Sequence, residues 1–532
     1  MSRLRVPTTD RAVLAIPSFD ALPALVEENR RRLNRDDIQI GGLPLRELRA
    51  LARREVLELA RSSSAEEGFD VDAPLLLAGH QPELSHPGVW VKNFALNGLA
   101  KKIGGIPLNL IVDNDTLKST SLHVPVIPDR GPKVHSESVA FDTFSGEVPY
   151  EDRKIEDASV FRTFAERVAP LSANWGFETL LAHCWASGGR ESSVESETTG
   201  DSRPPLAQNI GETFTAMRTN REEAWGCKNL ELLVSLLFWS EGYARFVAHI
   251  LADLSRFAGV YNSAILKYRT ANGIKSRNHP APELQQRAKD IEAPFWMRWY
   301  GQDRRTRFWV WRNDNQLHFS NGTHIAADTN RFVHEWPEFS ESGTRLSPRA
   351  LTLTLFARVC LGDFFIHGIG GGKYDEVTDD IIRNYFGIEP PAYQVLSATL
   401  RLPLPTLPST PDDLKRAERR VRDLHWNPQR HLVPEQLARP EVQWLLTRKN
   451  TLIANEPPLT DHTARKAWFR ELQAVTIELR HFVWKQPTIA KSDLTRIRAE
   501  VAANEVLQRR DYSWVLYPEE TLRPFLQRFL NL

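Results

Sequence analysis

The sequence PLLLAGHQPELSHPGVWVKNFALNGLAKKIGGIPLNLIVDND, residues 74–115, decides the fold. Its first apolar run, residues 74–78, is typical of a buried strand, and a helical stretch follows from about residue 88 to residue 103. A pair of glycines ends this stretch, as glycines commonly do after a helix, and a second apolar run follows at 106–112. Strand, helix and strand in succession form a βαβ unit. The pattern therefore predicts an α/β fold with a parallel sheet and a right-handed crossover.

The loop after the first predicted strand is rich in polar side chains and glycine. Its candidate ligand-binding residues are Gly79, His80, Gln81, Ser85, His86 and Gly88. In open α/β sheets ligands bind beyond the carboxyl ends of the strands, and the N–H groups and dipole of the next helix favour a phosphate chain. His80 and His86 are also similar to the paired histidines with which nucleotidylyl transferases neutralise a triphosphate. The alternative is a turn whose polar side chains satisfy only backbone groups.

An acidic segment, Asp113-Asn114-Asp115, follows the second predicted strand. Two carboxylates two residues apart provide oxygen ligands for Mg²⁺ or a means of orienting a substrate amine. Asp113 and Asp115 are therefore candidate catalytic residues together with His80, and Asn114 is a candidate binding residue. The alternative is that the carboxylates cap the next element of structure, which aspartate does well.

A glycine-rich segment lies between a predicted strand at 363–367 and a helix that we expect to open at Lys373. Its candidate binding residues are His367, Gly370, Gly371, Gly372 and Lys373. Glycines at such a junction let the backbone approach a phosphate closely, and the lysine adds a positive charge. The segment is not a P-loop, because three residues instead of four separate Gly368 from Gly372, so a purely structural turn is the alternative. Since all three segments follow predicted strands, we expect them at one edge of the sheet.

Composition limits the class of protein. The 532 residues are too many for one hydrophobic core, so two or three structural units are expected. Lys and Arg (68) nearly balance Asp and Glu (67), which argues against a general nucleic-acid-binding surface. The three cysteines have no CxxC spacing, so neither a disulfide framework nor a structural zinc site is predicted. Because no apolar run approaches the ~20 residues of a membrane span, we expect a cytoplasmic protein without a membrane partner.

The predicted core covers residues 1–401 and includes a helical insertion at about 150–290. Within it, residues 207–270 are expected to be helical, with their leucines at helical spacing in the core. A Ser-, Gly- and Pro-rich segment at 187–205 is typical of a surface insertion. Aromatic runs within 307–319, separated by Asn-Asp-Asn, predict a β-hairpin.

Closely spaced prolines from residue 402 onwards mark the end of the predicted core. Residues 402–510 are rich in Arg and Leu, and long helices are predicted at 411–424, 461–485 and 488–509. Polar helices separated by proline-containing turns favour an antiparallel coiled-coil arm. The final segment, residues 511–532, is expected to return to the core.

The same segments are similar, in the same order, to landmarks of the bacillithiol-biosynthesis cysteine-adding enzymes. Gly79-His80-Gln81 followed by Pro87-Gly88 resembles that family's glycine–glutamine–glutamine segment and the helix start behind it. Asp113-Asn114-Asp115 resembles its Asp-His-Asp stretch, and residues 368–372 resemble its glycine-rich segment. The run Ser397-Ala398-Thr399-Leu400 resembles a strand that follows in the family. The likeness covers most of the predicted core, with a helical arm behind it.

The resemblance implies a Rossmann-like core related to nucleotidylyl transferases, an adenine-nucleotide site, and a coiled-coil arm that forms a homodimer. The family's reaction joins cysteine to the free amine of a glucosaminyl malate, a ligase-like step in low-molecular-weight thiol biosynthesis. By this likeness, Asp113 or Asp115 orients the amine. His80, His86 and Lys373 neutralise developing phosphate charge. Two other functions stay open: plain nucleotidylyl transfer, and a catalytically inactive nucleotide-binding scaffold that dimerises through the arm.

Overall fold

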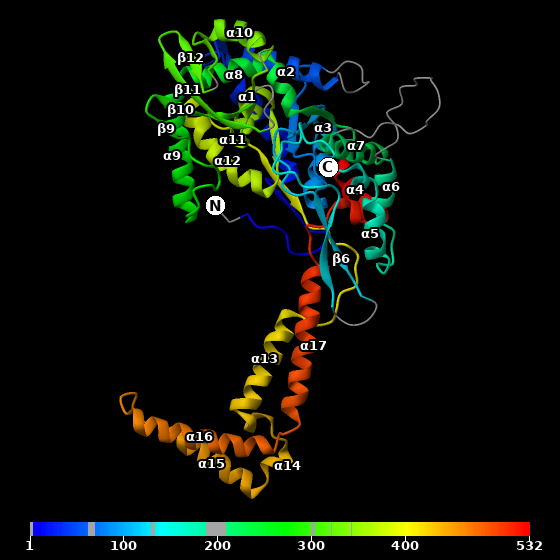
Figure 1. The fold of residues 1–532 in the computed structure, drawn as a ribbon, viewed down its shortest axis with the longest axis vertical. Coiled ribbons are helices and arrows are strands. Elements are labelled where there is room, and N and C mark those ends of the chain that lie inside the picture. Colours follow the sequence, from blue (N-terminus) through cyan, green and yellow to red (C-terminus); the bar gives the residue numbers. More distant parts are fainter. Residues whose placement is uncertain are drawn as a thin grey trace.

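A computed structural model describes residues 4–61, 70–128, 133–187, 209–298, 304–320, 322–341 and 343–532. These residues form a mixed α/β body from which a helical arm projects (Figure 1). The body holds two main sheets, one largely parallel and one antiparallel. Apart from its first residue, the segment predicted as an insertion at 187–205 lies outside the described residues.

The central sheet has six strands in the spatial order β1-β16-β15-β4-β5-β8. Their bounds in that order are Val13–Ile16, Gln394–Ala398, Phe364–His367, Leu75–His80, Ile106–Ile111 and Leu230–Leu233. All neighbours are parallel except β1, which pairs antiparallel with β16. Along the chain, β4, β5 and β8 build towards one edge, whereas β15 and β16 build towards the other. The winding therefore reverses between β4 and β15, and such a reversal opens a crevice at the carboxyl ends of the two strands.

The βαβ unit predicted from residues 74–115 is confirmed. Helix α3 (Pro87–Ile103) connects β4 to β5, which pair in parallel. The first four residues of β4 are buried, because a sheet covered on both faces needs apolar side chains on both. The helix is capped at its start by the His86 imidazole, and it ends at Gly104 with a φ of 66°. Local signals thus define both ends of this helix.

The prediction of helix throughout residues 207–270 is wrong in its middle. Residues Leu230–Leu233 form strand β8 and pair in parallel with β5 at the edge of the central sheet. The spacing of apolar residues in so short a run is compatible with either a strand or a buried helix. Here the run forms a strand because it pairs with β5, which would otherwise be the edge of the sheet. The surrounding elements are α7 (Ile210–Ala224), the 3₁₀ turn η2 (Val234–Trp239), α8 (Glu241–Ala252) and α9 (Leu254–Asn272).

The antiparallel sheet has the order β13-β12-β11-β10-β14, and β9 also pairs with β10. Its strands, in chain order from β9 to β14, are Gln286–Arg287, Asp290–Arg298, Thr306–Asn313, Gln316–Phe319, His324–Ala326 and Arg345–Pro348. Strands β11 and β12 form the hairpin predicted within residues 307–319. Helix α10 (Thr329–Glu341) packs against this sheet through the Phe319–Phe339 ring contact. The aromatic residues of the hairpin therefore serve in part as core.

Two hydrophobic clusters cover the two faces of the central sheet. Leu77 packs into the cluster formed with α2 and α8, whereas Leu76 packs into the cluster formed with α3 and the C-terminal residues. The remaining elements of the body are η1 (Phe19–Ala21), α1 (Leu22–Leu33), β2 (Gln39–Ile40), β3 (Leu43–Pro44), α2 (Leu45–Arg61), β6 (Ser121–Val126), β7 (His135–Ala140), α4 (Ala158–Arg162), α5 (Phe164–Ser172), α6 (Leu180–Ser187), α11 (Ala350–Leu355), η3 (Phe356–Leu361), α12 (Ile369–Ile381) and η4 (Ile382–Phe386). The alternation of strand residues between two covered faces places the core on both sides of the sheet.

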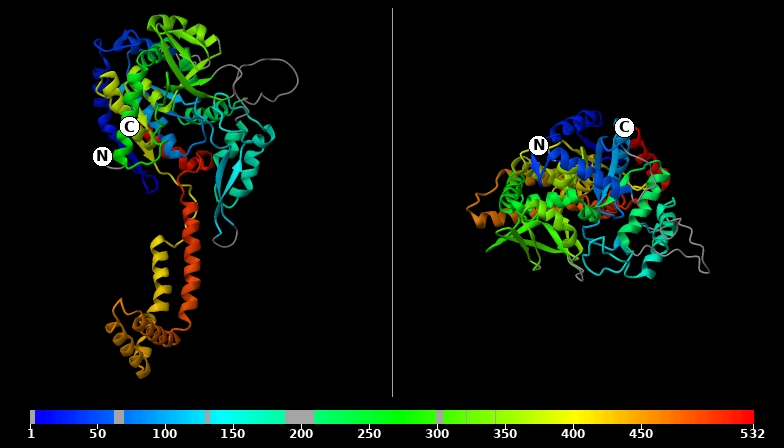
Figure 2. Two further views of the ribbon diagram at one scale, coloured as in Figure 1. Left: turned by 60° about the vertical axis from the view of Figure 1, so that its left-hand side comes forward. Right: turned by 90° about the horizontal axis from the view of Figure 1, so that it is seen from above.

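The arm consists of a two-helix stalk and a helical tip (Figures 1 and 2). Helices α13 (Pro411–Trp426) and α17 (Gln486–Leu507) lie side by side in the stalk. The tip contains η5 (Pro428–His431), α14 (Pro434–Leu437), α15 (Pro440–Ala454) and α16 (His462–His481). A separate small core of the arm includes Leu424, Val442 and Leu479.

After the arm, the chain returns to the body. The elements η6 (Trp514–Leu516), α18 (Glu519–Gln527) and η7 (Arg528–Leu530) follow α17, and both α18 and η7 pack on α3. The last residues therefore belong to the core around the first βαβ unit. Across the described ranges, no helix combines the length and apolar character needed to cross a bilayer.

Candidate functional site

A cavity of about 750 Å³ lies where the winding of the central sheet reverses. Its walls come from the ends of β4, β5 and β15, from the starts of α3 and α12, and from the antiparallel sheet. The predicted site residues that line it are Gly79, His80, Gln81, His86, Gly88, Asn114, Asp115, His367, Gly370 and Gly371. The predicted residues outside the lining are Ser85, Asp113, Gly372 and Lys373. All three predicted segments therefore contribute to one cavity.

Two histidines and a lysine form the α3 side of the cavity. His80 is half-buried at the end of β4, where burial, and after it the charge of Lys92, lowers its pKa to about 3. The His86 Nδ1 accepts the Gly88 N–H at 3.0 Å, and burial followed by a nearby arginine lowers the pKa of His86 to about 4. Lys92 is buried in α3 and donates to the Gly79 carbonyl at 3.1 Å, while burial lowers its pKa to about 8. Both imidazoles are therefore neutral at neutral pH.

The acidic segment divides between two environments. The buried Asp113 carboxylate accepts hydrogen bonds from the Ser235 N–H at 2.9 Å and from the Ser235 hydroxyl at 2.5 Å. Asp113 thus binds the start of η2, a segment distant in the sequence, and not the element that follows it in the chain. Asp115 lines the cavity and accepts from Gln81 at 2.9 Å and from Arg305 at 3.2 Å. Burial opposes the ionisation of Asp115, but these donors outweigh burial and lower its pKa.

Of the two carboxylates, that of Asp115 lines the cavity and that of Asp113 does not, and a Mg²⁺ site here stays a prediction. Asp113 bonds to Ser235 and lies outside the lining of the cavity. Asp115 is therefore the one acidic side chain among the described residues that line the cavity. Among the residues that the structure describes, no group of three His, Cys, Asp or Glu side chains could hold a metal ion.

The helix predicted to open at Lys373 begins one turn earlier, at Ile369. Gly371 lies in its first turn, and no side chain caps the start of this helix. Gly372 has a packing role, because a Cβ at that position would lie 2.4 Å from the Val395 side chain. The uncapped N–H groups of the first turn, next to the cavity, are donors suited to an anion.

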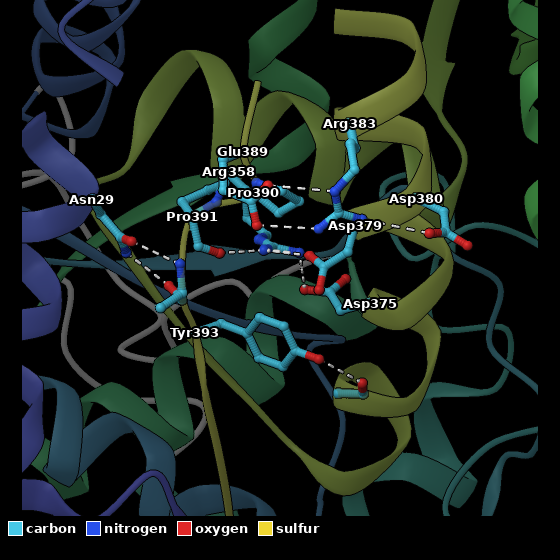
Figure 3. A network of polar contacts seen from close by, with 12 residues as sticks. Asn29, Arg358, Asp375, Asp379, Asp380, Arg383, Glu389, Pro390, Pro391 and Tyr393 are labelled. Atoms are coloured by element: carbon cyan, nitrogen blue, oxygen red, sulfur yellow. Dashed lines mark hydrogen bonds and ion pairs between the residues drawn. The ribbon is translucent and has the colours of Figure 1, made fainter. Parts of the chain in front are cut away.

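A buried charge network fixes His367 at the end of β15. His367 Nε2 lies 2.6 Å from Asp375 Oδ2, and the same oxygen accepts from Arg358 at 3.0 Å. Figure 3 shows Arg358 next to the carboxylates of Asp375 and Asp379. The Asp379 carboxylate accepts a hydrogen bond from Arg358 at 2.7 Å. Burial would raise the pKa of Asp375, but its contacts with His367 and Arg358 outweigh burial and lower it. The ionised carboxylate therefore holds Nε2, and Nδ1 lies beside Gly371 in the cavity wall.

Several lining residues were not among the candidates predicted from the sequence. They are Lys92, Trp296, Arg305, Arg349 and Arg510. The Trp296 ring contacts two guanidinium groups, Arg305 at 4.7 Å and Arg349 at 4.4 Å from its centroid. Lys92 reaches the cavity from α3, one turn after Gly88, so helical spacing in the predicted helix could have indicated it. No local spacing could have indicated Trp296, Arg305, Arg349 and Arg510, because their proximity to the first loop depends on contacts between distant segments.

The lining of the cavity combines basic and apolar side chains. The basic side chains are His80, His86, Lys92, Lys118, Arg305, Arg349 and Arg510, and Asp115 supplies the one carboxylate among the described lining residues. Leu110, Val112, Tyr261, Trp296, Leu351 and Tyr374 are among the apolar and aromatic ones. This combination suits a small molecule that carries both an anionic group and a flat apolar part. No protein-family model matches the sequence, and no curated protein matches it.

The two cavity histidines predict a loss of stability in mild acid. Unfolded histidine titrates near about 6.5, whereas His80 and His86 titrate at about 3 and about 4 in the fold. Between these values the unfolded chain binds protons that the fold does not, so stability falls as the pH drops from about 6.5 to about 4. Each histidine contributes at most about 1.4 kcal/mol per pH unit, and less here because both are partly exposed to solvent.

Urea unfolding at about pH 7 and about pH 5 measures this loss. A His80→Gln, His86→Asn variant should lose less stability over the same interval, since two of the responsible groups are gone. An equal loss in the variant would assign the acid sensitivity to other groups.

Proposed function

We propose that this chain is a nucleotide-dependent enzyme that joins an amino acid to an amine-bearing small molecule. One observation carries the proposal. At the reversal point of the central sheet, basic side chains and the starts of two helices surround a cavity that is otherwise largely apolar and aromatic. A nucleotide has the matching parts, because its phosphate chain is anionic and its base is flat.

The order of the parallel strands supports a Rossmann-like core. The central β4 is the first parallel strand in the chain, and later strands are added on both of its sides. In sheets wound in this way, nucleotides bind across the point where the order reverses. The cavity lies at this point, next to the starts of α3 and α12.

The residues near α3 and α12 are suited to a phosphate chain. Neutral His86 can donate a hydrogen bond from Nε2, because its Nδ1 accepts the Gly88 N–H. Neutral His80 donates its Nδ1–H to the Gln81 carbonyl at 3.1 Å and leaves Nε2 as an acceptor. The uncapped start of α12 adds N–H donors. The nucleotide, when bound, would supply the energy to activate the carboxylate of the amino acid. These residues would orient the phosphates and stabilise the charge that develops on them.

The acceptor amine requires a carboxylate to orient it and a base to take its proton. Asp115 stays ionised through its donors Gln81 and Arg305, so it can attract and orient an amine. His367 is fixed by Asp375 and has its Nδ1 at the cavity wall, where it can accept a proton. Lys373 is outside the lining, so Lys92 is better placed for the cationic role expected of a lysine.

Calorimetric titration with ATP, ADP and AMP, with and without Mg²⁺, tests the nucleotide site. We expect the His80→Gln, His86→Asn variant to bind ATP at least about tenfold more weakly than the wild type, since the His86 donor to phosphate and the neighbouring His80 side chain are both altered. The asparagine retains a cap for α3, so the fold should be preserved. His318→Gln, on the antiparallel sheet, is the matched control and should bind like the wild type. Absence of ATP binding in the wild type would refute the nucleotide site.

ATP–pyrophosphate exchange separates the proposed ligase from its alternatives. Exchange that requires an amino acid, with cysteine tested first, supports the ligase. Exchange without an amino acid supports plain nucleotidylyl transfer, which the neighbouring His80 and His86 favour. Nucleotide binding without any exchange or product would favour the inactive scaffold.

A further inference from the structure

The chain re-enters the body immediately after the arm and packs against the loop that precedes α3. The backbone N–H of Trp514 donates to the Ser85 carbonyl at 2.9 Å. The centroid of the Trp514 ring lies 4.7 Å from that of the Trp90 ring in α3. The Tyr517 hydroxyl donates to the Leu400 carbonyl at 2.7 Å. These buried contacts hold the segment beside the cavity rather than on the surface of the body. Ser85, predicted as a ligand-binding residue, thus contributes its carbonyl to this docking.

Arg510 is the residue of this segment that reaches the cavity. Its Nη2 donates to the Ala398 carbonyl at 3.0 Å and contacts the Ser397 hydroxyl at 3.3 Å, at the end of β16. It also lies against the start of α3, since a Cβ built on Gly88 would be 2.6 Å from Nη2. Its Nε is buried without a hydrogen-bond partner among the described residues. The guanidinium is therefore held in place by neutral groups and retains an unused donor.

The three arginines of the cavity differ in their charge balance. Arg305 pairs with Asp115 at 3.2 Å, and Arg349 pairs with Glu292 at 2.7 Å. Arg510 has no carboxylate within ion-pair distance in the part of the chain that the structure describes. Its neighbour Asp511 is bonded to Arg509 instead, at 2.8 and 2.9 Å. Among the described residues that line the cavity, Arg510 is thus the arginine without an ion-pair partner.

We infer that Arg510, with Ser397 and the start of α3, forms the subsite for a phosphoryl group of the ligand. The inference rests on the proposed function in so far as that group belongs to a nucleotide. A phosphoryl group would balance the charge of Arg510 and accept hydrogen bonds from its guanidinium, a pairing whose geometry arginine matches. The C-terminal segment is then part of the binding site. Gly88 is required there, because a Cβ would lie 2.1 Å from the Ala398 carbonyl oxygen and 2.6 Å from Arg510 Nη2.

Calorimetric titration of the full chain with ATP, adenosine and inorganic pyrophosphate tests the subsite. We expect Arg510→Gln to weaken ATP and pyrophosphate binding by about 10- to 100-fold, the effect of losing a hydrogen bond to a charged group. Adenosine binding should not change, because adenosine lacks the phosphoryl group. Arg509→Gln is the matched control: it removes the adjacent guanidinium, which lies outside the cavity, and should leave all three affinities unchanged.

The possible results distinguish this inference from the proposed function. Equal affinities in Arg510→Gln and the wild type, or an equal loss for ATP and adenosine, would overturn the subsite. Pyrophosphate binding that depends on Arg510, without ATP binding, would support the subsite and reject the nucleotide-dependent enzyme. If the wild type binds neither ATP nor pyrophosphate, both the subsite and the nucleotide-dependent enzyme are rejected. If Arg510→Gln does not fold, Arg510→Lys replaces it in the test. Lysine keeps the positive charge but lacks the planar set of N–H donors of a guanidinium, so we expect an intermediate loss of ATP affinity.

Discussion

Replacement of Asp363 by asparagine is expected to destabilise the central sheet by about 3–5 kcal/mol, the cost of leaving buried charges unpaired. Asp363 precedes β15, and its carboxylate accepts from Arg49 at 2.6 Å and from Arg53 at 2.8 Å. It also accepts the Leu75 N–H of β4 at 2.8 Å. Asp363 is 2% exposed and the two arginines are 6% and 8% exposed, so water cannot replace the lost charge. The amide of asparagine would moreover present a donor to a guanidinium.

Hydrogen exchange of the β4 and β15 amides measures the effect, because it reports the free energy of opening of these strands. Lys267→Gln is a suitable control, since its partner Asp380 is 2.8 Å away but the lysine side chain is 71% exposed. Such a pair contributes less than about 1 kcal/mol. Asp363 lies at the opposite end of β15 from His367, so the folded variant should retain its ATP affinity. Unchanged exchange in Asp363→Asn would mean that both arginines find other partners.

The parts of the fold that sequence predicts well are those set by local signals. The βαβ unit at 74–115 combines two apolar runs of strand length with a helix that begins at a proline and ends at a glycine. The hairpin within 307–319 likewise has alternating aromatic residues around a turn sequence. Because both patterns depend on neighbours in the chain, their strands and helix could be located before any tertiary contact was known. The reversal of winding gathers the loops that follow β4, β5 and β15 at one cavity.

The errors arise where distant contacts outweigh local preference. Glycine disfavours helix interiors, so the sequence predicted that α12 would start after the glycines. The glycines are helical because Gly372 packs directly on Val395 of β16, and its carbonyl accepts from Tyr393 at 3.0 Å. Arg510 could not be assigned to the cavity from its sequence context, because the intervening arm lies between it and the rest of the site. The coiled-coil dimer and the cysteine-adding reaction stay predictions.

His367→Gln is expected to reduce amide formation by about 100-fold or more, the usual contribution of a general base. In the proposed reaction the acceptor amine loses a proton as its nitrogen bonds to the acyl carbon, and glutamine cannot take up that proton. The neutral replacement should have little effect on ATP affinity or on amino-acid-dependent exchange, because both precede attack by the amine. The variant should therefore separate activation of the amino acid from its transfer.

Two measurements on the same protein sample make this separation: ATP–pyrophosphate exchange, and formation of the amide product with a saturating amine. His318→Gln controls for the loss of a histidine outside the cavity and should retain both activities. Loss of both activities in His367→Gln would instead mean that the histidine positions the nucleotide. Retention of both would reduce the Asp375–His367 contact at 2.6 Å to a structural ion pair. Loss of transfer alone is the result that requires a proton acceptor at the end of β15, because Asp375 and Arg358 stay in place and the binding of the nucleotide is preserved.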